Sequence, residues 1–343
     1  MIKRSLFSAK YEIMGQFNNL TVLIFMLFCS VASSQSVAAL LDMYSAKEGV
    51  EWDPHRQTIT FLKSGTIQST QNSWRIPHTV KQVIIAENVT LIGRFDCSSD
   101  LVIEGQDRDN SILFGTDEPK YAKRNGGGDK LSAVRVTKGR VRLQNLTSLN
   151  PKGFHFTSRD GSGFFEISNC NLYDRRGGQQ NNSDGIVTWG GGKVSNCYIA
   201  SGDDAIKVYG SITVEDTHIE MIPNAVPIQL GWGNYGNGAV GIFKNIKISG
   251  TEGRYGAGRP IISARRGKYQ KKILIDGITI DNPHASLLSF REGHGDFQIS
   301  INRANIRVAR FQHDWNAEVQ ANIKICGVEY DENTELNQWN CAK

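Results

Sequence analysis

Short β-rich segments that recur along the chain constrain the fold of this sequence more than any other feature. From about residue 100 to 330, runs of alternating apolar residues are separated by Gly, Asn and Asp turns, and helical periodicity is almost absent. The aligned units recur about every 20 to 32 residues and read QNLTS, SNCNL, SNCYI, EDTHI, KNIKI, DGITI, RANIR and CGVEY. A strand-only repeat of this length is typical of one coil of a solenoid.

The repeat predicts an all-β chain folded as a single-stranded right-handed parallel β-helix. Coils of such a fold stack at the interstrand spacing of ~4.8 Å, so side chains at equivalent positions form ladders along the axis. We expect one ladder of turn residues, formed by Asn145, Asn169, Asn196, Asp216 and Asn245. A β-sandwich is the alternative fold, although sandwich strands come in hairpins with more closely spaced turn signals.

The two ends of a solenoid need to be covered. Residues 35–95 are expected to form an N-terminal cap and the first coils, because 36–60 contains the best helical pattern in the chain. Further coils are expected over 96–330, and a C-terminal tail over 331–343 can protect the other end. No linker interrupts this order, so we predict a single domain over 35–343.

The first 34 residues have the features of a secretory signal peptide. Three basic residues precede an apolar stretch of about a dozen residues, and small residues then lead to a cleavage position before Gln35. The apolar stretch is shorter than the ~20 residues that span a bilayer. We therefore predict a secreted or periplasmic protein that does not associate with a membrane after the signal is removed.

The charge pattern bears on the possible partners. The chain has a formal net charge of +5, but its lysines and arginines are scattered rather than gathered on one segment. This pattern does not favour nucleic-acid binding, which needs a concentrated basic face, whereas a mildly basic surface suits an anionic polymer. We expect a monomer without a cofactor.

Five cysteines remain once the signal containing Cys29 is removed, and their spacing matches no metal site. Export makes disulfides possible. Cys326 and Cys341 are candidates for a disulfide that holds the C-terminal tail. Cys170 and Cys197 both follow the dipeptide SN, which places them close together in neighbouring coils, either as a stack of buried thiols or as a second disulfide.

Three aspartates in SDGI and GDDAIK are the strongest candidates for a catalytic site. With one coil of 20 to 27 residues, Asp184 lies one coil before Asp204, and together with Asp203 they share one face. Carboxylates so close repel each other, which raises the pKa of at least one of them. Glycoside hydrolysis uses such a set, with a protonated acid for the leaving oxygen and a carboxylate base for water. Aspartates are also common turn residues, but turns do not require two adjacent ones on opposite faces of a strand.

These motifs resemble those of known β-helical enzymes. SDGI followed by GDDAIK is similar to the paired aspartates of the polygalacturonase group of glycoside hydrolases. The closer similarity is to glycoside hydrolase family 49, the dextranases and isopullulanases, in which a DDAIK-Y run is followed by a strand like VPIQLGW, 226–232. Weaker similarities are RPIISA at 259–264 and ASLLSFR at 285–291. The resemblance covers about 140–300, and the N-terminal β-sandwich of family 49 has no room in this chain.

The resemblance implies inverting hydrolysis of a polysaccharide, with an α-glucan such as dextran or pullulan as substrate. Asp203 would be the general acid, while Asp184 and Asp204 would hold and deprotonate water, with the acid and base carboxyls ~6.5 to 9.5 Å apart. The candidate substrate-binding residues are Lys207, Gln229, Trp232, Tyr209, Arg265 and Arg291. For Lys207, a structural role as the partner of an aspartate is an equal alternative.

Two other functions are compatible with the sequence. In a polysaccharide lyase, the aspartates would bind calcium and a lysine or arginine would abstract a proton next to a uronate carboxylate. The ARR at 264–266 and the positive charge fit this alternative, and the charge also favours an anionic substrate, either a uronate or a sulfated glycan. A non-catalytic β-helix that binds carbohydrate is the other alternative, because a fold does not fix a function.

Overall fold

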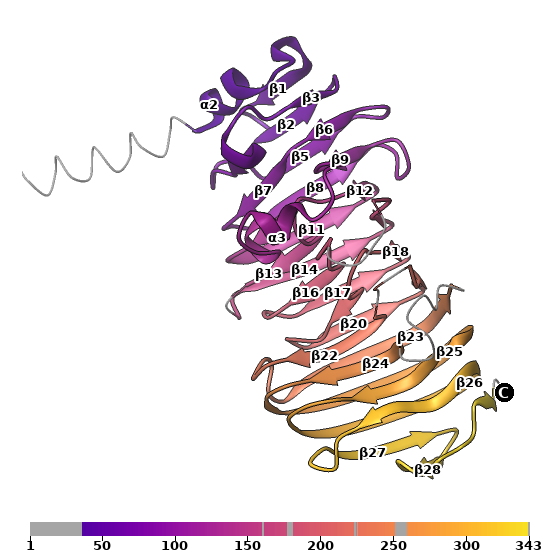
Figure 1. The fold of residues 1–343 in the computed structure, drawn as a ribbon. Helices are drawn as coiled ribbons and strands as arrows, with labels where there is room; N and C mark the ends of the chain where they lie inside the picture. Colours follow the sequence, from indigo (N-terminus) through magenta and orange to yellow (C-terminus); the bar gives the residue numbers. More distant parts are fainter. Residues whose placement is uncertain are drawn as a thin grey trace, which may run out of the picture.

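The protein is described by a computed structural model, which covers residues 36–341 apart from 160, 177–180, 223, 225 and 251–258. The predicted signal peptide, 1–34, lies outside the described residues. The chain is mostly β, with one long sheet in which parallel pairs dominate (Figure 1). The predicted all-β class is therefore correct. Among the described residues, no helix is long and apolar enough to cross a membrane.

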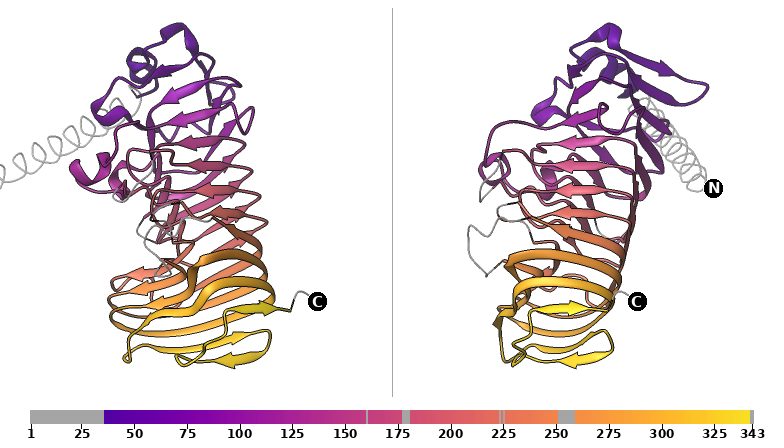
Figure 2. Two further views of the ribbon diagram at one scale, coloured as in Figure 1. Left: turned by 45° about the vertical axis from the view of Figure 1, so that its right-hand side comes forward. Right: turned by 90° about the vertical axis from the view of Figure 1, so that its right-hand side faces the viewer.

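Three rows of parallel strands build most of the sheet, and the chain visits the rows in turn (Figure 2). The first row contains β2 (Thr58–Phe61), β5 (Gln82–Ile85), β8 (Leu101–Gly105), β11 (Gly139–Gln144), β14 (Gly163–Ser168), β17 (Gly192–Ser195) and β20 (Ile212–Glu215). The second row contains β3 (Gly65–Thr66), β6 (Thr90–Ile92), β9 (Ile112–Phe114), β12 (Thr147–Leu149), β15 (Asn171–Tyr173), β18 (Tyr198–Ala200) and β21 (His218–Glu220). The third row contains β4 (Ser73–Arg75), β7 (Arg94–Cys97), β10 (Val134–Val136), β13 (Phe156–Ser158), β16 (Ile186–Thr188), β19 (Ile206–Lys207), β22 (Ile228–Trp232) and β24 (Pro260–Arg265). Each strand pairs with the next strand of its own row, so one passage through three strands is one repeat.

Longer strands continue these rows toward the C-terminal end. They are β23 (Ala239–Ser249), β25 (Lys268–Phe290), β26 (His294–Trp315) and β27 (Gln320–Ile325). β23 pairs with both β20 and β21, and β25 pairs with both β23 and β24. The same pairing of neighbouring repeats thus continues at this end, where one long strand takes the place of strands from two rows.

The core forms because the inward-facing residues of one row stack on one another. In the first row, Leu143, Ile167 and Val194 are register partners, and Val214 and Phe243 continue the stack. All five side chains are buried. Burying an apolar side chain of this size contributes about 1.5 to 3 kcal/mol, so each added repeat stabilises the one before it.

The two ends of the sheet are covered by short elements. At the N-terminal end, α2 (Ser36–Met43) buries Leu40, and β1 (Val50–Asp53) pairs antiparallel with β2. At the C-terminal end, β28 (Val328–Tyr330) and β29 (Gln338–Asn340) pair antiparallel with β27 and β26. The remaining helical turns are η1 (Lys47–Gly49), η2 (Thr70–Asn72), α3 (Tyr121–Arg124) and η3 (Asp129–Leu131).

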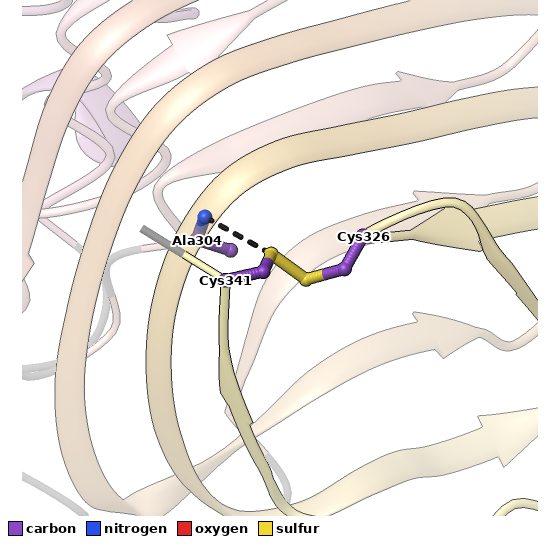
Figure 3. Close-up of a disulfide and its surroundings, with 3 residues drawn as sticks. All are labelled: Ala304, Cys326 and Cys341. Atoms are coloured by element: carbon purple, nitrogen blue, oxygen red, sulfur yellow. Dashed lines mark hydrogen bonds between the residues drawn. A yellow bond between two sulfur atoms is a disulfide. The ribbon is translucent and has the colours of Figure 1, made fainter. Parts of the chain in front are cut away.

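The cysteines lie at positions that the stacked repeats bring together. Cys326 and Cys341 form a disulfide with their Cα atoms 5.9 Å apart, which ties the C-terminal tail to the last strands (Figure 3). Cys170 and Cys197 are free and buried, and the N–H of Tyr198 donates to the carbonyl of Cys170 across neighbouring repeats. Of the two alternatives for this pair, the structure contains the stack of thiols.

The predicted turn ladder is present between the first and second rows. Its five members adopt a left-handed backbone with φ between 48° and 54°, and they are Asn145, Asn169, Asn196, Asp216 and Asn245. The amide of Asn169 donates to Asn145 at 2.8 Å and that of Asn196 donates to Asn169 at 3.1 Å, while Asn245 donates to Asp216 at 3.0 Å. Asn and Asp suit this position because they tolerate the left-handed conformation and bond to their neighbours.

We predict that Asn169→Ala lowers the free energy of unfolding by about 2 to 3 kcal/mol, because it removes ladder hydrogen bonds and puts an alanine at positive φ. Asn169→Gly removes the same hydrogen bonds but tolerates φ, so its loss should be about 1 kcal/mol smaller. Urea-induced unfolding of the three proteins measures both effects. Wild-type stability in both variants would contradict a stabilising ladder.

Candidate functional site

The in-register pairing of the third row brings the three aspartates together. The N–H of Gly185 donates to the carbonyl of Asp204 at 2.9 Å, so Asp184 and Asp204 occupy equivalent positions just before β16 and β19. One carboxylate oxygen from each of Asp184, Asp203 and Asp204 lies within 4.8 Å of the other two. The eighteen residues between Asp184 and Asp203 thus belong to one repeat.

The three carboxyl groups differ in their access to solvent. Asp184 is fully buried and Asp204 is 4% exposed, whereas Asp203 is partly exposed. Asp203 Oδ1 accepts the N–H of Asp204 at 3.1 Å, which orients the carboxyl group. Asp184 Oδ1 is buried and has no hydrogen-bond partner among the described residues. Asp203 is therefore the carboxyl that a molecule arriving from solvent reaches first.

Lys207 neutralises part of this negative charge. Its ammonium bonds to Asp184 Oδ2 and lies 3.2 Å from Asp204 Oδ2, and it also lies 5.2 Å from the centre of the Phe154 ring. The side chain of Lys207 is only 12% exposed. Three clustered carboxylates are a donor set that suits a cation, and here the ammonium of Lys207 bonds to two of them. The structure thus favours the role of aspartate partner over direct sugar binding for this lysine.

Burial and charge shift the pKa values of the site in a consistent direction. Burial raises the pKa of Asp184 to about 7, with Lys207 acting against and Asp204 adding to the rise. Burial also raises the pKa of Asp203 well above its usual range, and the charges of Asp204 and Asp184 add to it. For Lys207, burial lowers the pKa, but the two carboxylates outweigh it and the net pKa is raised. Near neutral pH the site therefore holds a protonated Asp203 beside a charged lysine.

A polar clamp that sequence reasoning missed fixes the segments carrying the aspartates. Asp174 is buried and accepts the guanidinium of Arg176 at 3.0 and 2.6 Å. The hydroxyl of Ser183 also donates to Asp174, and its oxygen accepts the N–H of Gly202 at 3.1 Å. Ser183 precedes Asp184 and Gly202 precedes Asp203, so the clamp ties both segments to one buried carboxylate.

Two predicted substrate-binding residues are buried, which corrects their assignment. Gln229 lies beside Lys207 in the register of β19 and β22, but it is 1% exposed and its amide oxygen accepts the N–H of Gly231. Tyr209 is 5% exposed because its ring packs between Trp189 and Tyr235, at 5.1 and 4.8 Å. Neither side chain is exposed to solvent in the way that direct stacking on, or hydrogen bonding to, a sugar would need.

Three other predicted binding residues lie at or near the surface, further along the third row. Trp232 is 38% exposed and is the register partner of Arg265, whose guanidinium lies 4.4 Å from the centre of the indole. Arg291 pairs with Asp314 at 2.8 Å and lines a separate hollow that also contains Trp315. Trp232 and Arg265 are thus within one or two repeats of the aspartates, while Arg291 is engaged by its own carboxylate.

Comparison with known protein families and with curated proteins finds no match to this chain. The functional assignment therefore depends on the geometry of the site and on the resemblance of its motifs.

We predict that Lys207→Met lowers the free energy of unfolding at pH 7 by about 3 to 5 kcal/mol, because it leaves buried carboxylates without their partner. A raised pKa of Asp184 means that the folded state binds a proton between pH ~4 and about 7, so stability falls as pH rises through this window. Without Lys207 that window extends to higher pH, and the loss should shrink at pH 5.

Denaturant unfolding at pH 5 and 7 measures this effect. The double variant Asp184→Asn with Lys207→Met should recover part of the loss, because it removes an uncompensated buried charge. Lys244→Met is the matched control, since Lys244 pairs with Glu215 at 2.9 Å on an exposed surface and should change stability little. Equal losses for Lys207→Met and Lys244→Met would contradict the importance of the buried pair.

Proposed function

We propose that this chain is a polysaccharide hydrolase built on a single-stranded right-handed parallel β-helix, with Asp203 as its general acid. One observation carries the proposal: a partly exposed carboxyl with a raised pKa lies beside two buried carboxylates that share one lysine. General acid catalysis needs a carboxyl that keeps its proton near neutral pH, and the second carboxylate supplies a base. The resemblance of SDGI and GDDAIK to family 49 supports the same roles.

In this proposal, Asp203 donates its proton to the glycosidic oxygen as the bond to the anomeric carbon breaks. Asp184 and Asp204 hold a water molecule and accept its proton as the water oxygen bonds to that carbon. The positive charge of Lys207 opposes the effect of burial on Asp184, whose pKa is raised to about 7, so that Asp184 is partly ionised and able to accept a proton near neutral pH. Proton exchange with solvent then restores Asp203 to its acid form.

The stereochemical course remains a prediction from the resemblance. Inverting enzymes separate the acid and base carboxyls by ~6.5 to 9.5 Å and retaining enzymes by ~5 Å. The 4.8 Å limit joins one oxygen from each aspartate and is a different measure from the separation of the carboxyl centres. The anomer released first, followed by NMR, distinguishes the two courses.

We further propose that the enzyme is exported and acts as a monomer without a cofactor. The signal-like composition of 1–34 supports export. A monomer is supported by the covered sheet ends, because α2 lies at one end and the antiparallel β28 and β29 at the other. A lyase is less well supported, since Lys207 is held between two carboxylates and is not placed to abstract a substrate proton.

The central test compares wild type with Asp203→Asn on dextran, pullulan, polygalacturonate and algal galactans. Wild type should release reducing ends from at least one of them, and the variant should do so at least 100-fold more slowly, which is the loss expected for a general acid. Products that absorb in the ultraviolet would indicate a lyase. Binding without release of reducing ends would indicate a carbohydrate-binding protein.

We also predict that Ser183→Ala lowers kcat about tenfold with little change in KM, because the clamp positions the carboxylates but lies too deep to contact substrate. Ser183 is fully buried. Ser249→Ala is the matched control, since it removes a hydroxyl that bonds to His218 at 2.6 Å away from the third row. Equal losses of activity in both variants would show that Ser183 acts through general stability alone.

A further inference from the structure

Two stacks of an arginine on a tryptophan flank the aspartates along the third row. The guanidinium of Arg159 lies 4.9 Å from the centre of the Trp189 ring, and that of Arg265 lies 4.4 Å from the centre of the Trp232 ring. Trp189 directly follows β16, and Trp232 is the last residue of β22. Since β16, β19 and β22 are consecutive neighbours, the two stacks lie on either side of the strand that follows the aspartate pair.

The stack of Arg265 on Trp232 has the properties of a binding platform. Trp232 is 38% exposed and Tyr235 nearby is 41% exposed, so aromatic surface faces solvent here. Neither residue is needed to complete the core, because the inward positions of β22 are filled by Ile228 and Leu230. An exposed indole fixed in a strand is well suited to stack on the apolar face of a sugar ring.

Arg265 differs from its neighbours in having no carboxylate partner. Arg266 pairs with Glu292 at 3.0 Å, and Arg291 pairs with Asp314 at 2.8 Å. Within the described part of the chain, Arg265 forms no ion pair, although it is half-buried against Trp232. A guanidinium remains charged at any physiological pH and presents a fork of donors that matches a carboxylate or a sulfate ester.

We infer that the substrate is an acidic polysaccharide, with a carboxylate or sulfate ester of one sugar bound by Arg265 while that sugar stacks on Trp232. This inference rests on the proposed hydrolase. Arg159, which stacks on Trp189, is already paired with Asp129 at 3.1 Å, so the inference rests on Arg265 and Trp232 alone. The acidic substrate class replaces the neutral α-glucan expected from the family 49 resemblance.

Binding is measured by calorimetry on the Asp203→Asn protein, which does not consume its ligand. The ligands are a galacturonate oligosaccharide, a sulfated galactan oligosaccharide and a neutral isomaltose oligosaccharide of equal length. One of the two acidic ligands should bind more tightly than the neutral one, and its affinity should fall as salt is added. Whichever acidic ligand binds more tightly identifies the carboxylate or the sulfate ester as the recognised group.

Substitutions in the same Asp203→Asn background locate the contact. Arg265→Gln should weaken binding of the acidic ligand roughly 10- to 100-fold, the range for a lost charge-assisted hydrogen bond, and leave the neutral ligand unaffected. Arg266→Gln is the matched control, because Arg266 lies 5.8 Å from the same indole but is engaged by Glu292, and it should have little effect. Circular dichroism of each variant confirms that it is folded.

The results distinguish a failure of the acidic-substrate inference from a failure of the proposed hydrolase activity. Tighter binding of the neutral ligand, or equal effects of Arg265→Gln and Arg266→Gln, would overturn the acidic substrate class and leave the hydrolase proposal intact. Tight, Arg265-dependent binding of an acidic ligand that wild type does not cleave would support the platform and overturn the hydrolase. Absence of binding to all three ligands would overturn the inference.

Discussion

The in-register pairing of each strand with the next strand of its own row is the constraint on which the rest of the structure depends. It sets equivalent residues of neighbouring repeats ~4.8 Å apart, and it acts on polar and apolar residues alike. The same register that stacks Leu143 on Ile167 also sets Asp184 beside Asp204 and Trp232 beside Arg265. Because a shift of one residue would turn every side chain to the opposite face, the apolar core fixes the geometry of the site.

By placing buried charged groups next to one another, this register determines the protonation of the site. Two buried carboxyl groups, Asp184 and Asp204, contact one ammonium at Lys207 in a region shielded from water. Burial raises the pKa of the third carboxyl, Asp203, and the charges of Asp204 and Asp184 add to the rise. The proton on Asp203 is thus a consequence of its burial and of the neighbouring carboxyls, one of which, Asp184, comes from the preceding repeat.

The sequence predicts the repeating features well and the local ones poorly. The all-β class, the turn ladder from Asn145 to Asn245 and the proximity of the aspartates follow from periodicity, because stacking converts sequence distance into spatial contact. The burial of Gln229 does not follow, since alternation predicts one exposed face for β22, whereas both faces of this strand are buried from residue 228 to 231. The clamp on Asp174 could not be predicted from the sequence either. It joins side chains from three segments, and the bends between rows determine whether these segments meet.

An acidic substrate would be repelled by the carboxylates of the site, and the positive charge of Arg265 reduces this repulsion. A carboxylate or sulfate ester near Asp203 would raise the pKa of that acid further and would also oppose ionisation of Asp184. Arg265 counteracts this repulsion, because a guanidinium bonded to the substrate anion partly neutralises its charge. The arginine would then both bind the substrate anion and screen the carboxylates from it. Since Arg265 sits in a strand and is stacked on Trp232, its position is fixed before the ligand arrives, which reduces the conformational entropy lost on binding.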